Sequence, residues 1–251
     1  MHTTENMKNL LPTEAYFYKD TQKASLSSYI DFMLPHEKHG WCIVLSRTIF
    51  YPQGGGQKGD RGAIYIDTGL AGDLNLPSMF KVKDTRKDGI HILHVLDDFD
   101  PTLVDTIKDN LYGELVSTQI DFNFRLKQMR LHSIAHLLHF FTQEVCNLVD
   151  LPYPVSSDLL QNSGINRYES DFRVSRDEIA LIKDRLKKFA DSHQDIKTFP
   201  DEIKDGYRYW LCDKYLVPCG GAHLTNTKNI GDFALSVSNK KGQTSIKFEL
   251  S

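Results

Sequence analysis

The amino-acid sequence predicts an α+β protein in which a small N-terminal β-barrel is followed by a two-layer α+β domain. Residues 13–100 contain short alternating or apolar runs, each closed by turn residues, as is typical of strands. Residues 116–149 instead repeat apolar side chains at helical spacing. A chain of 251 residues is long enough for two cores, and the change of pattern predicts domains at residues 1–102 and 103–251.

The N-terminal domain is expected to consist of short strands. Two turn-rich segments, residues 52–62 and 68–78, interrupt the apolar runs, as in a small barrel or a curled antiparallel sheet. The strands are expected at Ala15–Tyr18, Trp41–Ser46, Ala63–Asp67, Met79–Val82 and Ile90–Val95.

The second domain is expected to combine helices and strands. One long helix, or two in sequence, covers residues 116–149, and a polar loop containing prolines follows at residues 150–164. Ser175 and Glu178 form a capping box that begins the next helix. Strands that can pack on both helices are expected at Tyr168–Val174, Thr198–Ile203, Phe233–Val237 and Ser245–Leu250.

Composition is typical of a soluble globular protein, with 40% hydrophobic and 25% charged residues. No stretch approaches the roughly 20 continuous apolar residues of a membrane span, and residues 1–20 lack a basic start followed by an apolar run. We therefore expect a cytoplasmic protein with no membrane partner.

Charge and cysteine usage narrow the function classes further. The four cysteines are too few and too irregularly spaced for a secreted disulfide framework. The formal net charge of −3 offers no general attraction to a polyanion. A nucleic acid would therefore bind only through a local patch.

The segment HSIAH at residues 132–136 is the first chemical signal. Histidines at positions i and i+4 share one face of a helix, so His132 and His136 can reach one metal ion. The glutamate of H-E-x-x-H is absent, which excludes that type of metalloprotease. Taken alone, two such histidines are more often ordinary surface or core residues.

The segment CGGAH at residues 219–223 is the second signal. Its glycines permit a tight turn that aims the Cys219 thiol and the His223 imidazole at one point. Thiolate sulfur and imidazole nitrogen are ligands that zinc prefers, and tetrahedral zinc takes four. The sequence therefore predicts one Zn²⁺ bound by His132, His136, Cys219 and His223.

The glycine-rich segment at residues 51–62, YPQGGGQKGDRG, is the third signal. Adjacent glycines allow positive φ and close approach of another backbone or a substrate, and Gln53 and Gln57 add amide donors and acceptors. No G-K-[ST] follows, so a phosphate loop is not indicated. A simple hairpin turn is the alternative.

These three motifs, in this order, resemble the editing module of alanyl-tRNA synthetase and its freestanding AlaX-type relatives, in particular the intermediate-length trans-editing proteins. The resemblance covers most of the chain, and TNTKNIGDFAL and IKFEL resemble the family's C-terminal strands. The matched motifs are G-G-Q-x-G-D at Gly55, Gly56, Gln57, Gly59 and Asp60, H-x-x-x-H at His132 and His136, and C-G-G-T-H at Cys219, Gly220, Gly221 and His223, with Ala222 replacing threonine.

The resemblance implies a zinc-dependent deacylase that hydrolyses the ester of tRNA(Ala) mischarged with serine, or also with glycine. Catalytic roles then fall to His132, His136, Cys219 and Gln57. Zinc would lower the pKa of a water molecule or position the substrate. Four protein ligands usually close a zinc site, so catalysis requires a fifth position or a ligand that moves aside.

A pocket that selects serine over alanine must form hydrogen bonds with the serine hydroxyl. Candidates from the glycine-rich segment are Gly55, Gly56 and Gln57. We predict that Gln57→Ala weakens discrimination more than zinc binding. The loop after the histidine helix adds candidates at Ser157, Asp158 and Gln161.

Two basic clusters are candidate tRNA contacts. Arg125, Lys127 and Arg130 precede the zinc histidines, whereas the second helix carries Lys183, Arg185, Lys187 and Lys188. Such clusters are usually only the solvated face of a helix. Proximity to the proposed site favours Arg125 and Arg130.

Three other functions are compatible with the sequence. A noncatalytic, zinc-stabilised module could bind aminoacylated RNA or a protein partner. A metallohydrolase could act on another small ester or amide. Editing of threonine charging is a nearer alternative, because threonyl-tRNA synthetase has related zinc motifs.

Overall fold

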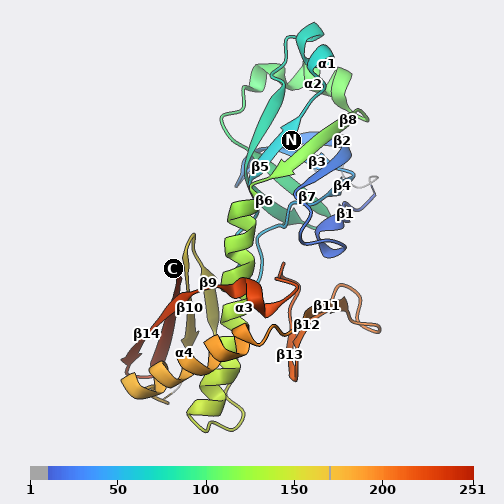
Figure 1. Ribbon diagram of the computed structural model, residues 1–251. Helices are drawn as coiled ribbons and strands as arrows, with labels where there is room; N and C mark the ends of the chain where they lie inside the picture. The colour runs from blue at the N-terminus through green and yellow to red at the C-terminus, as the bar shows by residue number, and fades with distance from the viewer. Residues whose placement is uncertain (1–10, 170) are drawn as a thin grey trace. The chain divides into compact units, whose positions relative to one another are not determined.

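The computed structural model describes residues 11–169 and 171–251 and confirms a mixed α+β architecture (Figure 1). Its residues group into two compact units. Unit 1 contains the described residues up to Gln53 together with Gly59–Arg125, and unit 2 contains Gly54–Lys58 and Leu126–Ser251.

This grouping differs from the division expected from the sequence at residues 102 and 103. Residues 103–125, which the sequence analysis assigned to the second domain, fall in unit 1. Residues 54–58 of the glycine-rich segment fall in unit 2, although the chain on both sides of them belongs to unit 1. Residues 54–58 therefore have most of their contacts with unit 2, unlike the residues before and after them in the sequence.

Unit 1 is built on antiparallel strands that close into a ring in the order β2-β3-β7-β6-β5-β8, with β8 pairing back onto β2. The ring strands are β2 (Ser25–His36), β3 (Gly40–Leu45), β5 (Gly62–Tyr65), β6 (Met79–Asp88), β7 (His91–Leu96) and β8 (Leu115–Ile120). The short elements are β1 (Glu14–Ala15), η2 (Tyr16–Tyr18), β4 (Arg47–Thr48), α1 (Thr68–Asp73), η3 (Pro101–Leu103) and α2 (Val104–Leu111).

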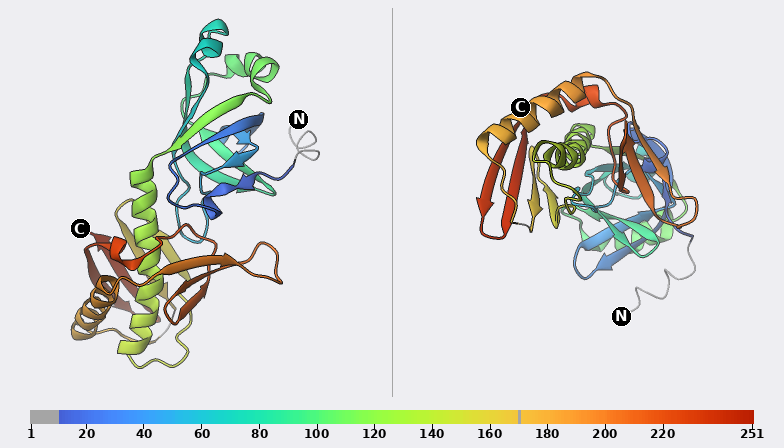
Figure 2. Two further views of the ribbon diagram at one scale, coloured as in Figure 1. Left: turned by 45° about the vertical axis from the view of Figure 1, so that its right-hand side comes forward. Right: turned by 90° about the horizontal axis from the view of Figure 1, so that it is seen from below.

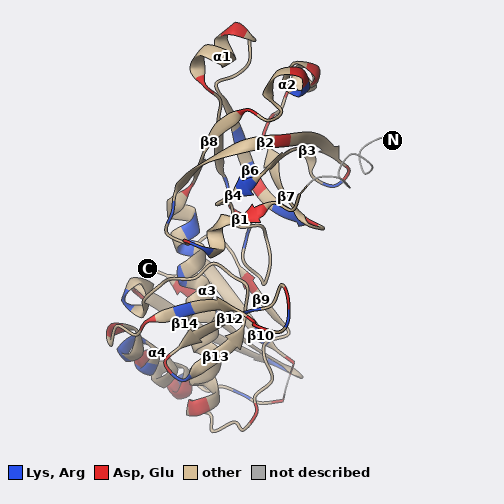
Figure 3. Ribbon diagram, turned by 90° about the vertical axis from the view of Figure 1, so that its right-hand side faces the viewer, with Lys and Arg blue, Asp and Glu red and all other residues tan. Residues whose placement is uncertain are grey.

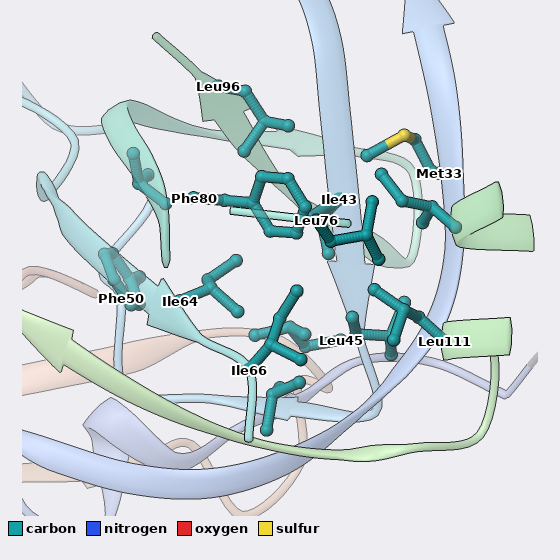
Figure 4. Close-up of a cluster of buried hydrophobic side chains, with 14 of the residues drawn as sticks. Met33, Ile43, Leu45, Phe50, Ile64, Ile66, Leu76, Phe80, Leu96 and Leu111 are labelled. Carbon is teal, nitrogen blue, oxygen red and sulfur yellow. The ribbon is translucent and has the colours of Figure 1, made fainter. Parts of the chain in front are cut away.

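The core of unit 1 comes from the buried side chains of these strands and of α1 and α2. Ile43, Ile64 and Leu111 are completely buried, and Figure 4 shows them gathered with their neighbours in one apolar cluster. Strand alternation explains this arrangement, since buried and exposed residues follow each other along β8.

A buried ion pair lies beside this core. Arg125 and Asp60 are both essentially inaccessible, and the Arg125 Nε lies 2.9 Å from both carboxylate oxygens of Asp60. The same guanidinium donates to the Ile49 carbonyl at 2.6 Å, and Asp60 accepts from the Tyr51 N–H at 2.6 Å. Every charged group of the pair is therefore matched by a hydrogen-bonding partner, as burial of charge requires.

Several expectations for unit 1 need correction. Ala15–Tyr18 is mostly the 3₁₀ helix η2 rather than a strand. Strand β2 was not predicted, because serines interrupt its apolar alternation, and the short polar helix α2 was also missed. Val116–Ile120, expected to be helical, forms strand β8, because pairing with both β2 and β5 closes the ring.

Unit 2 contains two helices and two antiparallel sheets. Helix α3 (Phe122–Val145) begins where the Asp121 carboxylate accepts from the Phe124 N–H, and its first residues count with unit 1. The larger sheet has the order β14-β15-β10-β9, and the smaller has β11-β12-β13. The remaining elements are β9 (Ser156–Leu159), β10 (Ser163–Tyr168), α4 (Arg176–Asp191), β11 (Ile196–Pro200), β12 (Arg208–Cys212), β13 (Tyr215–Pro218), η4 (Thr227–Ile230), β14 (Phe233–Lys240) and β15 (Gln243–Leu250).

Helix α3 has contacts with both sheets of unit 2 (Figure 2). On one side, the Asn166 amide of β10 donates to the Ala135 carbonyl at 2.9 Å. On the other side, the Tyr215 ring of β13 stacks on Phe140 with centroids 4.7 Å apart. Contacts on two sides hold α3 in place between the sheets. They therefore fix the helix that carries His132 and His136.

The tail of the chain follows the expected pattern with shifted bounds. The capping box of α4 is confirmed, with Ser175 and Glu178 hydrogen-bonded reciprocally. The strand expected at Tyr168–Val174 lies earlier, as β10, and residue 170 is outside the described residues. Strand β9 occupies part of the expected loop, and the hairpin β12–β13 was missed. None of the helices in the described part of the chain is both long and apolar enough to cross a bilayer.

Replacing Asp60 with alanine will leave the Arg125 charge buried without a counter-charge. We expect the free energy of unfolding of unit 1 to fall by about 3–5 kcal/mol. The control Asp97→Ala removes the partly exposed partner of the exposed Lys81 and should leave stability nearly unchanged. Chemical denaturation followed by Trp41 fluorescence in a Trp210→Phe background measures both, and equal effects of the two substitutions would contradict the prediction.

Candidate metal site

Four side chains capable of binding a metal come together in unit 2. His132 and His136 lie one turn apart on α3, whereas Cys219 and His223 lie in the turn that follows β13. One ligand atom from each of these residues lies within 4.8 Å of the other three. The Cys219 Sγ is 3.5 Å from the His132 Nε2 and 3.2 Å from the His223 Nε2.

The glycine before Ala222 is required by the geometry of this cluster. A Cβ atom at Gly221 would lie 2.2 Å from the His132 Cε1 and 3.0 Å from the His223 Nε2. Any residue larger than glycine at position 221 would clash with His132 and push the turn away from α3. The Gly221 N–H also donates to the Cys219 sulfur at 3.3 Å, which stabilises the turn.

Gln57 contacts both halves of the cluster through one atom. Its Oε1 lies 3.1 Å from the His132 Nδ1 and accepts from the Ala222 N–H at 3.1 Å. Because a backbone N–H can only donate, the amide is oriented with its oxygen toward the site. The His132 Nδ1 must then carry its proton, and its Nε2 offers a lone pair toward Cys219.

The glycine-rich segment holds Gln57 in this position. Gln128 of α3 accepts from the Lys58 N–H at 3.0 Å and donates to the Leu160 carbonyl at 2.6 Å. Gly56 has a φ of +82°, and a Cβ there would lie 1.7 Å from the Ser157 carbonyl oxygen. The segment is therefore packed between α3 and β9 within unit 2.

Burial keeps the histidines neutral. It lowers the pKa of His132 to about 4, and the pKa values of His136 and His223 fall well below their usual value through burial and the neighbouring imidazoles. Burial raises the pKa of the Cys219 thiol to about 11. The imidazoles are thus in the form that binds metals, while the thiol needs a nearby cation in order to ionise.

Three features around the cluster were missed in the sequence. The buried Nε2 of His136 has no hydrogen-bond partner in the described residues. Trp210 is completely buried, with its ring centroid 5.1 Å from that of His136, and forms a wall of the site. Ser133 lies 3.5 Å from the His223 Nδ1 and was overlooked between the two histidines. No sequence signal identifies Trp210, because β12 itself was not predicted.

The other predicted pocket residues lie at varying distances from this centre. Gly55 is exposed, and a Cβ there would lie 3.9 Å from the His132 Cε1, so it borders the cluster. The Ser157 hydroxyl donates to Asn166 at 2.8 Å. Asp158 is paired with Arg167, and Gln161 is exposed. Of these four residues, Gly55 is the one for which the structure shows proximity to a residue of the cluster.

The two arginines predicted to contact tRNA are hydrogen-bonded to other groups of the protein, Arg125 in its interior and Arg130 in a half-buried position. Arg125 is completely buried with Asp60, so a phosphate cannot reach it. Arg130 donates to the Ile230 carbonyl at 2.6 Å and to the Asp232 carbonyl at 3.3 Å. Proximity to the histidines in sequence does not determine exposure, because successive helical residues point in different directions.

The basic residues of α4 lie among acidic ones. Figure 3 shows positive and negative residues interspersed along this helix. Lys188 pairs with Asp184, and Lys187 pairs with both Asp191 and Asp232. This pattern is typical of a solvated helix face and provides no concentrated positive patch.

The cluster as a whole could hold a metal ion. It combines three imidazoles in their neutral form with one thiol, and the buried His136 Nε2 without a partner is a nitrogen that a metal would satisfy. The second nitrogen of His132 and that of His223 each have a hydrogen-bonding neighbour, an arrangement that orients metal-binding imidazoles.

Comparison with known proteins shows similarity to alanine–tRNA ligases. No protein-family model matches the chain. The chain is 26% identical over 246 residues to the alanine–tRNA ligase of Metallosphaera sedula and 27% identical over 254 residues to that of Sulfurisphaera tokodaii. These matches cover 90% and 92% of this chain.

The alanine–tRNA ligase of Ignicoccus hospitalis is 27% identical over 223 residues, or 81% of this chain. In each case the match covers only 22–25% of the relative. The chain is therefore related in sequence to alanine–tRNA ligases and spans about a quarter of the length of these relatives.

Proposed function

We propose that this chain is a zinc-dependent aminoacyl-tRNA deacylase that hydrolyses the ester of tRNA(Ala) mischarged with serine or glycine, in the manner of the AlaX-type trans-editing proteins. The observation that carries the proposal is the convergence of His132, His136, Cys219 and His223. Similarity to alanine–tRNA ligases over about 90% of the chain supports tRNA(Ala) as the partner.

Zinc fits the donor set and its spacing. A tetrahedral zinc ion with bonds of about 2.0–2.1 Å to nitrogen and 2.3 Å to sulfur separates its ligand atoms by about 3.3–3.6 Å. The Cys219 Sγ lies 3.5 Å from the His132 Nε2 and 3.2 Å from the His223 Nε2. All four ligand atoms lie within 4.8 Å of one another.

The residues of the site have different roles in the proposed reaction. When bound, zinc supplies Lewis-acid polarisation of the ester or of a water molecule. His132, His136, Cys219 and His223 would hold it, and Trp210 would exclude bulk water from one side. Gln57 fixes His132 through Oε1, while its buried Nε2 has no partner in the described residues.

This unpartnered Gln57 Nε2 is our candidate for recognition of the substrate. A buried N–H without an acceptor costs about 1–3 kcal/mol, which a hydroxyl oxygen of the substrate would recover and an alanine side chain would not. Gly55 borders the same region, and the absence of a side chain there leaves space beside His132.

The activity is tested by release of labelled serine from seryl-tRNA(Ala), with alanyl-tRNA(Ala) as the competing substrate. We expect rapid loss of serine and sparing of alanine by the wild-type protein, which should contain one zinc per chain. Cys219→Ala should lose both zinc and activity, whereas the control Cys146→Ala, outside the cluster, should retain them.

A folded, zinc-loaded wild-type protein that releases no serine would contradict the proposal. It would favour the noncatalytic module, in which zinc stabilises a surface for binding aminoacylated RNA. Serine release that survives Cys219→Ala unchanged would separate the activity from the metal site.

Two substitutions at Gln57 separate its two roles. Gln57→Ala removes the acceptor for His132 and should lower zinc affinity by about 10–100-fold. The structure thus favours a larger effect on zinc than the sequence alone predicted. Gln57→Glu keeps an acceptor at that position but replaces the Nε2 donor, so zinc affinity should be retained while serine-over-alanine selectivity falls.

Competition with a chromophoric chelator measures the zinc affinities, and the ratio of kcat/KM for the two charged tRNAs measures selectivity. Equal zinc affinity in wild type and Gln57→Ala would remove Gln57 from the support of His132. Full selectivity in Gln57→Glu would remove its Nε2 from the substrate site.

A further inference from the structure

A polar hollow on unit 1 has the composition of an anion-binding site. Its volume is about 410 Å³, and its polar lining consists of Lys23, Ser25, Ser27, Arg47, Ser117 and Thr118. The serines follow from strand geometry, because Ser27 of β2 is paired directly with Ser117 of β8 and both face outward. Because serine side chains are small, the two paired strands leave the hollow unfilled at this point.

Among the described residues, no carboxylate pairs with the cations of the hollow, and the Lys23 Nζ lies over the Tyr16 ring at 5.1 Å from its centroid. Within residues 11–169 and 171–251, neither Lys23 nor Arg47 belongs to an ion pair, and both are half-buried. Glu14, the neighbour of Arg47 across β1–β4, is paired with Lys19 instead. Two cations without a counter-charge therefore share one hollow with several hydroxyl groups.

Hydrogen bonds within the protein orient the Arg47 side chain before any anion binds. Its Nε donates to the Ser27 carbonyl at 2.9 Å, and its backbone N–H donates to the Ser28 hydroxyl. The terminal nitrogens of the guanidinium remain as donors for an anion, and a planar guanidinium suits phosphate oxygens. Serine hydroxyls beside it can donate to the same oxygens.

Exposed aromatic residues next to the hollow indicate a polynucleotide rather than a small anion. Tyr65 is the cross-strand partner of Ser117 and is 38% exposed, and Tyr29 lies two residues beyond Ser27 on the same face with 48% exposed. Tyrosine rings that reach solvent offer stacking and hydrogen-bonding surfaces for nucleotides, which a free phosphate would not use.

We propose that this hollow binds phosphate groups of the tRNA backbone, with Lys23 and Arg47 as the contacting cations. The inference rests on the proposed function for the identity of the RNA. It assigns the contact with tRNA to unit 1, in place of Arg125, which is completely buried, and Arg130, whose guanidinium group donates to backbone carbonyls.

The test measures binding of uncharged tRNA(Ala) to the full chain over a range of salt concentrations. The double variant Lys23→Gln/Arg47→Gln should bind about tenfold more weakly, and its log–log salt dependence should be less steep by about 1–2, near 0.9 for each phosphate that the variant no longer neutralises. The control Lys87→Gln/Lys108→Gln removes two exposed charges from the same unit and should leave both quantities near wild type.

A second variant guards against a folding artefact. Ser117→Asp adds a negative charge to the hollow without removing either hydrogen bond of Arg47, and it should also weaken tRNA binding. Its control, Asn110→Asp on α2, adds the same charge at an exposed position and should not. Unfolding midpoints of all variants show whether each one is folded.

Two outcomes would overturn the inference. Equal effects of the hollow and control variants on tRNA affinity would show that only the net charge of the protein matters, not the position of Lys23 and Arg47. Unchanged tRNA binding in Lys23→Gln/Arg47→Gln, with pyrophosphate binding abolished in that variant, would assign the hollow to a small phosphate compound. Failure of the proposed function is distinct, because it would appear as tRNA binding that depends on the hollow without any release of serine.

Discussion

A single amide oxygen joins the parts of the candidate metal site. The Oε1 of Gln57 accepts from His132, 75 positions further along the chain, and from the backbone of Ala222. Loss of this acceptor would leave two buried donors unsatisfied, each at a cost of about 1–3 kcal/mol. The same contact decides which imidazole nitrogen of His132 faces Cys219. Local packing of the glycine-rich segment therefore controls the chemistry of a histidine on α3.

The glycine-rich motif performs two physically separate tasks. Gln57 belongs to unit 2 and supports the histidine cluster, whereas Asp60, three residues later, belongs to unit 1 and neutralises buried Arg125. Gly56 allows the first task, since its positive φ and its contact with the Ser157 carbonyl exclude a side chain. A motif that forms one signal in the sequence thus supplies a ligand-orienting amide to one unit and a buried counter-charge to the other.

The sequence predicted the cluster residues better than their surroundings. His132, His136, Cys219 and His223 could be found because helical spacing and a glycine turn are local patterns, and the structure brings them together. The mixed α+β class and the capping box of α4 were also predicted from local sequence patterns. Trp210 and Gln128 were not predictable, because their roles depend on contacts between distant segments. Strand β8 was mistaken for helix for the same reason, since its pairing partners lie elsewhere in the chain.

The central claim is that three imidazoles and one thiolate bind a single zinc ion in unit 2. X-ray absorption spectroscopy of the zinc-loaded protein tests this claim directly, because it counts nitrogen and sulfur neighbours and measures their distances. The account predicts one sulfur at about 2.3 Å and three imidazole nitrogens at about 2.0–2.1 Å, with the sulfur absent in Cys219→Ala. A zinc ion without a sulfur neighbour, or with two, would contradict it.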